Sequence, residues 1–240
     1  MPRRILEFFL PLVFFMLFDL LWYNVIGSAA AMRGVNYAPY LVSRLDTAFP
    51  FMSVFIVPYA FTWILPPLCV AYLVFDGKTD YAAMRHMYAA FAVLCLLHCM
   101  LWLAVPVKTQ FAIREFVGER SSNPLDRLTL FVHDHAVLWN SLPALHVAAP
   151  WFIYRVAGLH ARRLSRPLLA LTVVIAVSTM AIKIHYLADG LAGVLCAEAT
   201  FRGVFGRVSV RNTLARVNGV LYSLTYVALA ILLLAAFVWL

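Results

Sequence analysis

Long apolar runs recur along the chain, and polar or basic segments separate most of them. An α-helix needs about 20 mostly apolar residues to cross the roughly 30 Å hydrocarbon core of a bilayer. The fourth and fifth runs are short, and the fifth and sixth meet at a hinge, so the pattern predicts six or seven membrane-spanning helices. We place the runs near Ile5–Gly27, Phe51–Phe75, Tyr81–Val105, Leu142–Ala157, Leu168–Ile184, Tyr186–Val204 and Val217–Leu240.

Composition supports a membrane location. Hydrophobic residues make up 64% of the 240 residues and charged residues only 12%, which is too apolar for an ordinary soluble domain. The first run carries Glu7 and Asp19 and lacks a small-residue cleavage site, so we interpret it as a retained helix rather than a signal peptide. We expect an all-α integral membrane protein with one domain over residues 1–240. Its core should cover about 46–204, and 217–240 should form an additional C-terminal span.

The net charge of +8 reflects topology rather than a binding surface. Most basic residues fall in alternate connections between the runs, which places those connections and the N-terminus in the cytoplasm by the positive-inside rule. We therefore expect no nucleic-acid partner, and we expect an integral protein of a bacterial cytoplasmic membrane. The basic residues that set this orientation are Arg3, Arg4, Lys78, Arg85, Arg155, Arg162, Arg163, Arg166, Arg202, Arg207, Arg211 and Arg216.

Two histidines and a carboxylate are predicted to meet at the opposite, extracytoplasmic face. His146 opens one run, and His185 and Asp189 stand where the next run ends. Consecutive spans run in opposite directions, so these positions lie at one depth. His185 and Asp189 are four positions apart and share a helix face, where the carboxylate fixes the imidazole tautomer and raises its basicity. One histidine can then attack phosphorus while the other protonates the leaving oxygen; a His–Asp pair that only joins helices is the alternative.

Two polar connections flank this region. Residues 107–140 form the longest polar segment and lead directly to His146, so we expect them to form a wall or lid of the site. Residues 28–50 are moderately polar, and they should form either an interfacial helix on the outer leaflet or a plain extracytoplasmic loop.

An attacked phosphate needs cations and hydrogen-bond donors around its oxygens. Lys183 lies two positions before His185 in an otherwise apolar run, where a charge usually faces a cavity or a partner. Lys108 and Arg114, at the outer end of the third run, are the other candidates. Simple snorkelling of these side chains to the membrane interface is the alternative.

No metal site is expected. His133, Asp134 and His135 are consecutive in the long polar segment, and in an extended stretch the two histidines would point the same way. No further ligands stand at the spacing of a structural metal site, and the chemistry above needs no metal. We expect contact with a polar headgroup or simple solvation there, and no cofactor. The cysteines, which we interpret as packing residues, are Cys69, Cys95, Cys99 and Cys196.

The histidine region resembles the type 2 phosphatidic acid phosphatase and vanadium haloperoxidase superfamily, which implies a six-helix core. The third motif of that superfamily reads Ser-Arg, five residues, His, three residues, Asp. Ser178, His185 and Asp189 fall at this spacing. Thr179 replaces the arginine.

The other two superfamily motifs are less complete. The second motif is Pro-Ser-Gly-His, and Pro143 and His146 match it, but Ala144 stands where the serine would be. The first motif is Lys, six residues, Arg-Pro. It is not intact, because Lys108 and Arg114 stand one residue too close together.

These departures look like the inositol phosphorylceramide synthase branch of the superfamily. The similar stretches are Leu-Pro-x-Leu-His ending at His146, Lys-x-His-Tyr beginning at Lys183, and Asp-x-x-Ala-Gly from Asp189 to Gly193. The Asp46–Phe51 segment before the second run also looks like that branch. The resemblance therefore covers roughly Asp46 to Gly193.

The resemblance implies a role for each matching residue. His185 would be the nucleophile that forms a phosphohistidine, and Asp189 would orient it. His146 would be the general acid for the departing alcohol and then the base for the acceptor. The residues around the phosphate oxygens would be Lys108, Arg114, Lys183, Ser141, Ser178 and Thr179.

The expected function is that of a lipid phosphoester phosphotransferase, which moves a phosphoryl-containing headgroup between lipids at the outer membrane face. A lipid phosphate phosphatase of the phosphatidic acid or polyprenyl phosphate type, using the same residues, is the alternative. A catalytically degenerate membrane scaffold is the second alternative, supported by Ala144, Thr179 and the broken first motif. The expected partners are a lipid phosphate or phospholipid substrate and the membrane. The lipid, the headgroup and the oligomeric state stay open.

Overall fold

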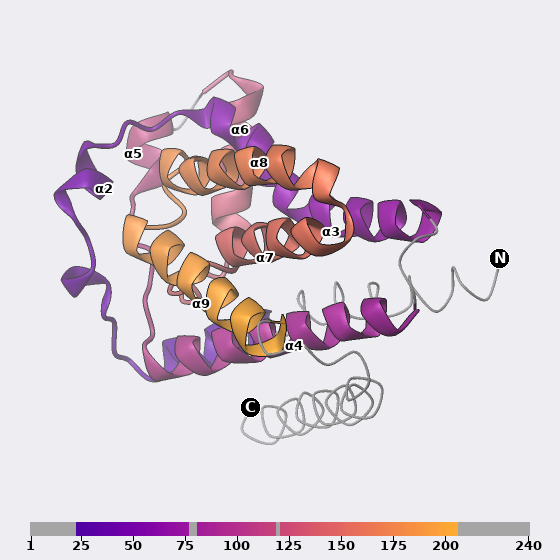
Figure 1. The fold of residues 1–240 in the computed structure, drawn as a ribbon. Helices are drawn as coiled ribbons and strands as arrows, with labels where there is room; N and C mark the ends of the chain where they lie inside the picture. Colours follow the sequence, from indigo (N-terminus) through magenta and orange to yellow (C-terminus); the bar gives the residue numbers. More distant parts are fainter. Residues whose placement is uncertain (1–22, 77–80, 119–120, 206–240) are drawn as a thin grey trace.

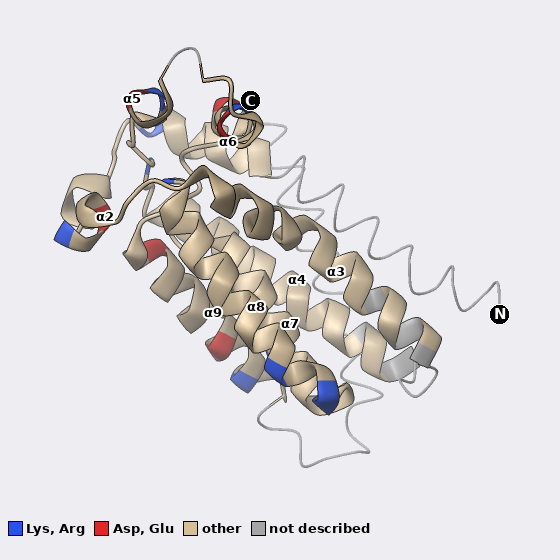
Figure 2. Ribbon diagram, turned by 90° about the horizontal axis from the view of Figure 1, so that it is seen from above, with Lys and Arg blue, Asp and Glu red and all other residues tan. Residues whose placement is uncertain are grey.

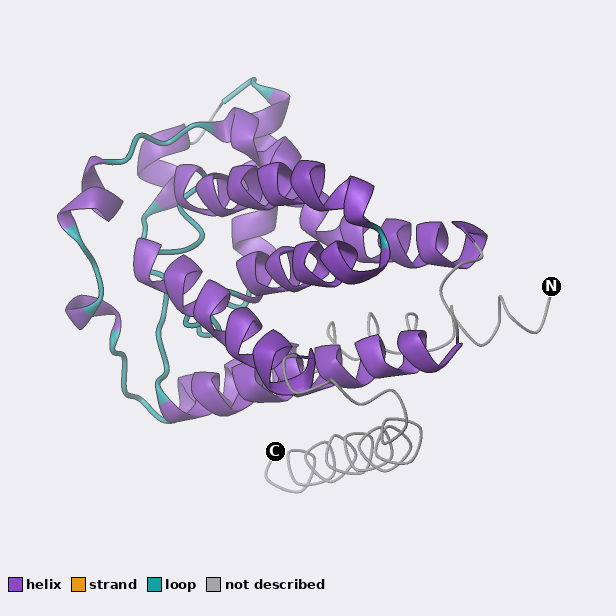
Figure 3. Cartoon of the chain, viewed as in Figure 1, coloured by secondary structure: helices purple, strands orange, loops and turns teal. Residues whose placement is uncertain are grey.

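The chain is helical and has no β-strand in the part that the computed structural model describes (Figure 1). An isolated bridge between Val107 and Asn140 is the one β-type pairing there, and the rest is helix, turn or loop (Figure 3). The all-helical class predicted from the apolar runs is thus confirmed for this part of the chain. The described residues are 23–76, 81–118 and 121–205.

The second to sixth apolar runs each correspond to a long helix. These helices are α3 (Ile56–Asp76), α4 (Tyr81–Ala104), α7 (Leu145–His160), α8 (Arg162–Ala181) and α9 (Leu187–Phe205). The shorter elements are residues 23–32, η1 (Ala38–Tyr40), α2 (Arg44–Ala48), η2 (Ser53–Phe55), α5 (Ile113–Val117) and α6 (Pro124–His135). The predicted span at 217–240 and most of the first run lie outside the described residues.

Helix α7 is the centre of the bundle. It packs most extensively against α8 and α9 and also contacts α3 and α4 (Figure 1). Large apolar side chains fill the space between these helices, among them Trp102 of α4, Phe152 of α7 and Phe201 of α9. Because α8 reverses the direction of α7, both α7 and α9 begin at the end of the bundle where α8 finishes (Figure 1).

The starts of α7 and α9 approach each other so closely that only small residues fit between them. A Cβ atom added to Gly193 would lie 2.5 Å from the carbonyl oxygen of Ala144. The N–H of Ala144 in turn donates to the carbonyl of Asp189 at 2.9 Å. Ala148 and Ala197 are fully buried in the same region. This close approach fixes the first turn of α7 against the first turns of α9.

Charged residues gather at the two ends of the bundle (Figure 2). Arginines lie at the connection between α7 and α8 and near the end of α9, whereas the opposite end carries α2, α5 and α6 with charges of both signs (Figure 2). At the arginine-rich end, Glu198 of α9 pairs with Arg155 of α7 and, at 2.6 Å, with Arg202 of its own helix. The pair with Arg155 joins α7 to α9 far from the end where both helices begin.

Two described helices are long and apolar enough to cross a membrane, namely His86–Ala104 within α4 and Arg162–Ala181, which is α8. Large apolar side chains are also exposed along α3 and α9, and an apolar exterior of this kind marks a surface that contacts lipid or protein. The described residues thus support membrane association. The most exposed of these side chains are Leu68, Phe75, Leu191 and Leu195.

Replacing Gly193 by Ala should destabilise the protein, because the new methyl group would overlap the Ala144 carbonyl. Overpacking of this kind costs about 1–3 kcal/mol. Thermal unfolding in detergent should therefore give a lower Tm for Gly193→Ala than for wild type. The matched control is Gly190→Ala on the same helix, where the nearest atom lies at an ordinary 3.9 Å and alanine should be neutral or stabilising. Equal Tm values for the two variants would contradict the close approach.

Candidate active site

His146, His185 and Asp189 come together at the end of the bundle where α7 and α9 begin. His146 is the second residue of α7, His185 lies in the α8–α9 turn (residues 182–186), and Asp189 is in the first turn of α9. Nδ1 of His146 is 3.3 Å from Nε2 of His185, and Nδ1 of His185 is 3.4 Å from Oδ2 of Asp189. The three residues are 7%, 3% and 0% exposed, respectively. The structure thus brings together the three residues that the sequence selected for acid–base chemistry.

A tyrosine extends this series of contacts. The hydroxyl of Tyr59, on α3, lies 3.1 Å from Nε2 of His146. Oδ2 of Asp189 accepts the N–H of Tyr186 at 2.9 Å, so the carboxylate acts as the acceptor. With neutral imidazoles, one proton arrangement satisfies every contact: Tyr59 donates to His146, and Nδ1–H of His146 donates to His185. Nδ1–H of His185 then donates to Asp189, and its Nε2 lone pair faces His146.

The backbone of the α8–α9 turn is held by side chains from distant segments. The carbonyl oxygen of Ile182 accepts the Nε2–H of His133 at 2.7 Å. The carbonyl oxygen of Ile184 accepts the hydroxyl of Thr109 at 3.0 Å. Buried backbone groups without partners are costly, so these bonds fix the conformation of the turn that carries His185.

The three predicted hydroxyl residues support the backbone around the site. Ser178 and Thr179 donate to carbonyl oxygens of their own helix, α8, at 2.6 and 2.8 Å. The hydroxyl of Ser141 bonds to that of Thr109. All three are buried, and their hydroxyl groups make no hydrogen bond to either histidine of the site. The carbonyl oxygen of Thr179 accepts the backbone N–H of His185 at 3.2 Å.

The three predicted cations have partners elsewhere. No hydrogen bond joins any of them to either histidine, and the structure brings none of them into the series of contacts above. The side chain of Arg114 is 62% exposed, which places it at the surface. The partners are the carbonyl oxygens of Asp46 and Phe49 for Lys183, the carboxylate of Asp134 for Arg114, and the ring of Trp139 for Lys108.

The start of α7 supplies a different kind of positive charge. Its N-cap is Ala144, whose side chain cannot cap the helix. The N–H groups of Leu145 and His146 make no hydrogen bond within the described part of the chain. The first N–H groups of a helix carry the positive end of its dipole and favour anions. Because His146 stands in this first turn, an anion beside the histidines would lie near these groups.

The histidines of the long polar segment have structural contacts. They lie on helix α6 rather than in an extended stretch, so they do not point the same way. His133 is buried against Ile182, and the solvated loop expected there is therefore wrong for this residue. The exposed His135 bonds through Nδ1 to the carbonyl of Phe131. Among the described residues, no group of three His, Cys, Asp or Glu could hold a metal ion.

Aromatic rings surround His146. The ring centroids of Tyr59, Trp63 and Tyr23 lie 5.1, 5.6 and 6.2 Å from that of His146. Sequence reasoning missed Tyr59, because a single tyrosine in an apolar run carries no periodic or motif signal. These rings limit the access of water to the histidine pair.

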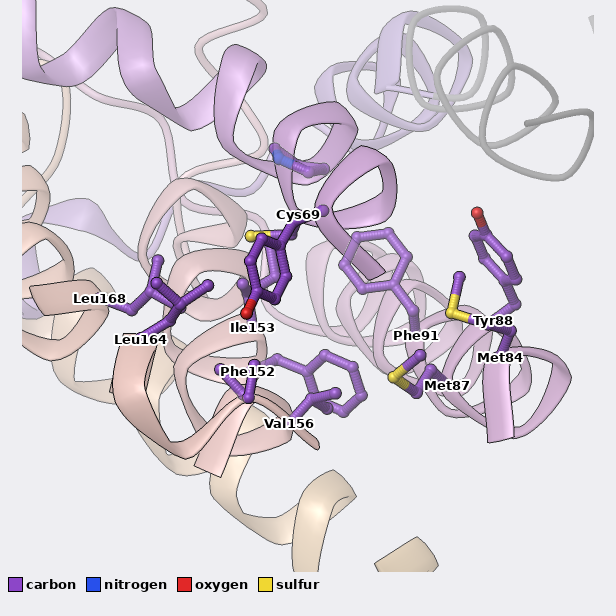
Figure 4. A pocket seen from close by; sticks show the side chains of 14 residues that line it. Cys69, Met84, Met87, Tyr88, Phe91, Phe152, Ile153, Val156, Leu164 and Leu168 are labelled. Atoms are coloured by element: carbon purple, nitrogen blue, oxygen red, sulfur yellow. The ribbon is translucent and has the colours of Figure 1, made fainter. Parts of the chain in front are cut away.

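A separate cavity of about 110 Å³ lies between α3, α4, α7 and α8 (Figure 4). Its walls are almost entirely apolar, and neither histidine of the site lines it. It lies further along α7 than His146, in the part of the bundle toward the arginine-rich end. The cavity offers mainly hydrocarbon surface, and its polar side chains are a cysteine and two tyrosines, Cys69, Tyr72 and Tyr88. Its walls include Cys69, Met87, Phe91, Phe152, Val156 and Leu168.

Comparison with known proteins gives one family. The sequence model described as the PAP2 superfamily matches residues 28–202, well over half of the chain. No curated protein and no solved structure gives a significant match. The family match agrees with the superfamily suggested by the histidine motifs, and it does not distinguish the inositol phosphorylceramide synthase branch.

Replacing His133 should flatten the pH dependence of stability. Burial lowers the pKa of His133 below its ordinary 6.5, whereas its bond to Ile182 raises it. As the pH falls, His133 is therefore protonated in the unfolded chain at a higher pH than in the folded protein. The free energy of unfolding decreases as the pH falls below 6.5 toward the lower pKa of the folded state. Between about pH 7.5 and pH 5.5, the Tm of His133→Gln in detergent should fall less than that of wild type.

The control for this prediction is His135→Gln, which removes an exposed histidine from the same helix. It should follow the wild-type decline. A decline for His133→Gln that runs parallel to wild type would show that His133 is not held neutral by burial.

Proposed function

The chain belongs to the PAP2 superfamily, and from this premise we propose that it is a membrane-embedded lipid phosphoester phosphotransferase that forms a phosphohistidine on His185. Membership supports phosphatase or phosphotransferase activity in general. The observation that carries the finer proposal is the continuous series of contacts from Tyr59 through His146 and His185 to Asp189. A scaffold that had lost its activity would have no need for a buried polar series of this kind.

In the first half-reaction, Nε2 of His185 attacks the phosphorus of the donor lipid. The bond from Nδ1–H to Asp189 keeps the lone pair on Nε2, and the carboxylate stabilises the positive charge that develops on the ring. His146 takes up a proton together with the anionic donor and acts as an imidazolium, whose Nε2–H donates to the hydroxyl oxygen of Tyr59, the reverse of the direction in the neutral arrangement. As the P–O bond breaks, the Nδ1 proton of His146 passes to the departing oxygen, and the alcohol leaves.

In the second half-reaction, the acceptor attacks the phosphorus of the phosphohistidine. Neutral His146 takes the proton of the acceptor hydroxyl, which restores the imidazolium. The N–P bond breaks, and its electron pair returns to Nε2 of His185. Each histidine thus ends the cycle in the protonation state in which it began.

The burial of the site supports transfer to an alcohol over hydrolysis. His146 and His185 are almost inaccessible, and aromatic rings surround His146. A lipid alcohol brought to the site by its apolar chain can compete with water where water is largely excluded. A lipid phosphate phosphatase with the same residues remains the second candidate, supported by the family match.

The charge of the site supports a phosphodiester donor. The predicted cations are engaged elsewhere, so the positive groups beside the histidines are chiefly the free N–H groups at the start of α7. A phosphodiester carries one negative charge and a phosphate monoester up to two. A site with few cations is better matched to the single charge, as in the headgroup of a phospholipid.

The proposed setting is a bacterial cytoplasmic membrane, with α3, α4, α7, α8 and α9 among six or seven spans. The exposed apolar faces of α3 and α9 support this arrangement. The arginine-rich end of the bundle would face the cytoplasm by the positive-inside rule (Figure 2). The histidines lie at the other end and would face the extracytoplasmic side.

Removing the nucleophile tests the proposal. Purified protein in nanodiscs would be incubated with a panel of phospholipids and lipid phosphates, and both free phosphate and new lipid products would be measured. We expect a headgroup-exchanged lipid for wild type and a loss of at least about a thousandfold in His185→Ala. Free phosphate that is lost in the variant would instead indicate the phosphatase.

The matched control is His135→Ala, which removes an exposed histidine of α6 and should keep wild-type activity. If His185→Ala equalled wild type on every substrate, His185 would not be the nucleophile, and the scaffold would become the better interpretation.

Tyr59→Phe should slow the reaction moderately, because it removes the hydroxyl that bonds to His146 and keeps the ring. A hydrogen bond to a charged group such as the His146 imidazolium is worth about 1.5–3 kcal/mol, which corresponds to a decrease in kcat of about 12- to 160-fold. Steady-state kinetics should show little change in KM. The control is Tyr40→Phe, since Tyr40 is 84% exposed. An unchanged kcat in Tyr59→Phe would remove Tyr59 from the mechanism.

A further inference from the structure

The short segment before α3 is bonded to the turn that carries His185. Asp46, in α2, is 2% exposed and uses both of its carboxylate oxygens. Oδ2 accepts the N–H and the hydroxyl of Ser43 at 2.7 and 2.6 Å, which completes the capping box of α2. Oδ1 accepts the N–H of Leu187, the first residue of α9, at 2.7 Å. One carboxylate therefore caps two helices that are far apart in sequence.

Lys183 makes a second connection between the same two segments, from the α8–α9 turn back to α2. Its ammonium group donates to the carbonyl oxygen of Asp46 at 2.6 Å and to that of Phe49. The rings of Phe111 and Phe116 lie over it, with centroids at 5.0 and 5.8 Å. Lys183 is 1% exposed, so the charge is held by α2 and by aromatic faces rather than by water.

The backbone of Lys183 adopts an unusual conformation at the point where its side chain bonds to the α2 segment. Its φ is 59°, in the left-handed region that non-glycine residues rarely adopt. A strained residue of this kind persists only where its surroundings determine it fully. Here the hydrogen bonds from the Lys183 ammonium group to the carbonyl oxygens of Asp46 and Phe49 hold the residue in this conformation.

The two connections bracket His185. Lys183 stands two positions before the histidine, and Leu187 stands two positions after it. Each is bonded to Asp46, through the backbone carbonyl in one case and the side chain in the other. Buried charged groups are tolerated only in a precise, fully bonded geometry, so both ends of the turn are fixed relative to α2.

We propose that Asp46 and Lys183 form a reciprocal clasp that positions His185 for attack on phosphorus. Both are then positioning residues, and Lys183 is not a phosphate ligand. The proposal rests on the phosphotransfer function proposed above. It predicts that the loss of either residue lowers kcat and leaves KM nearly unchanged, because the substrate still binds while the nucleophile is misplaced.

A kinetic double-mutant cycle tests the clasp. Asp46→Ala and Lys183→Met should each reduce kcat by about 10- to 100-fold, with KM changed by no more than about twofold. The two variants break different bonds of the same turn, and the loss of either one already misplaces His185, so the double variant should be slowed by clearly less than the product of the two single losses. Lys183→Arg keeps N–H donors for both carbonyl groups and should recover most of kcat.

Two kinetic outcomes would overturn the proposal. A Lys183→Met variant with a raised KM and weakened inhibition by inorganic phosphate would make Lys183 a phosphate ligand. Fully multiplicative losses in the double variant would show that the two residues act independently. The control variant is Arg44→Met, which removes an exposed cation from α2 and should match wild type.

Hydrogen–deuterium exchange tests the clasp without any activity. The N–H of Leu187 bonds to Asp46, so a peptide covering residues 182–189 should exchange at least about tenfold faster in Asp46→Ala and Lys183→Met than in wild type or Arg44→Met. Unchanged exchange would overturn the clasp. Faster exchange with an unchanged kcat would overturn its positioning role. Wild-type protein that is inactive on every lipid would overturn the proposed function, while the exchange would still decide whether the clasp exists.

Discussion

Backbone N–H and C=O groups inside an apolar bundle need hydrogen-bond partners, and the α8–α9 turn obtains its partners from remote parts of the chain. Two of its carbonyl oxygens bind His133 and Thr109, and the N–H that begins α9 binds Asp46. Each of these bonds holds a polar connection against the turn. The long polar segment (residues 107–140) and the segment before α3 therefore gather around His185. The position of this histidine follows from the hydrogen bonds that the backbone groups of the turn make with these segments.

Helix packing completes the geometry. Because Gly193 has no side chain, α9 can approach the backbone of Ala144, and the starts of the two helices stay together. Asp189 then lies in the first turn of α9, where the helix dipole stabilises its negative charge. His146 lies in the first turn of α7, beside N–H groups that are free to bind an anion. Two helix N-termini thus meet at one site. One stabilises the carboxylate that accepts from His185, and in the proposed function the other would favour a phosphate.

The departures from the superfamily motifs acquire a physical meaning in this arrangement. Thr179 stands where an arginine would be, and its hydroxyl donates to its own helix. Lys183 lies close to the histidine in sequence, yet its ammonium is bonded to α2, and its backbone adopts a conformation that costs about 1–3 kcal/mol. Such a cost is recovered only through the bonds that the conformation allows. The cation near the site thus stabilises the turn, and the site itself has few charges, as the proposed singly charged substrate group would require.

Within the described residues, the sequence by itself determined the helical class, the positions of the long helices and the meeting of His146, His185 and Asp189. These depend on apolar runs and on the alternation of span direction, which are local features and a simple topological rule. The tertiary structure decided the partners of Lys183, the burial of His133 and the contact between Tyr59 and His146. When a single polar residue stands in an apolar run, the sequence pattern does not predict which group it will bond to. That partner is fixed only when the helices pack and each buried polar group must find a donor or an acceptor across the bundle.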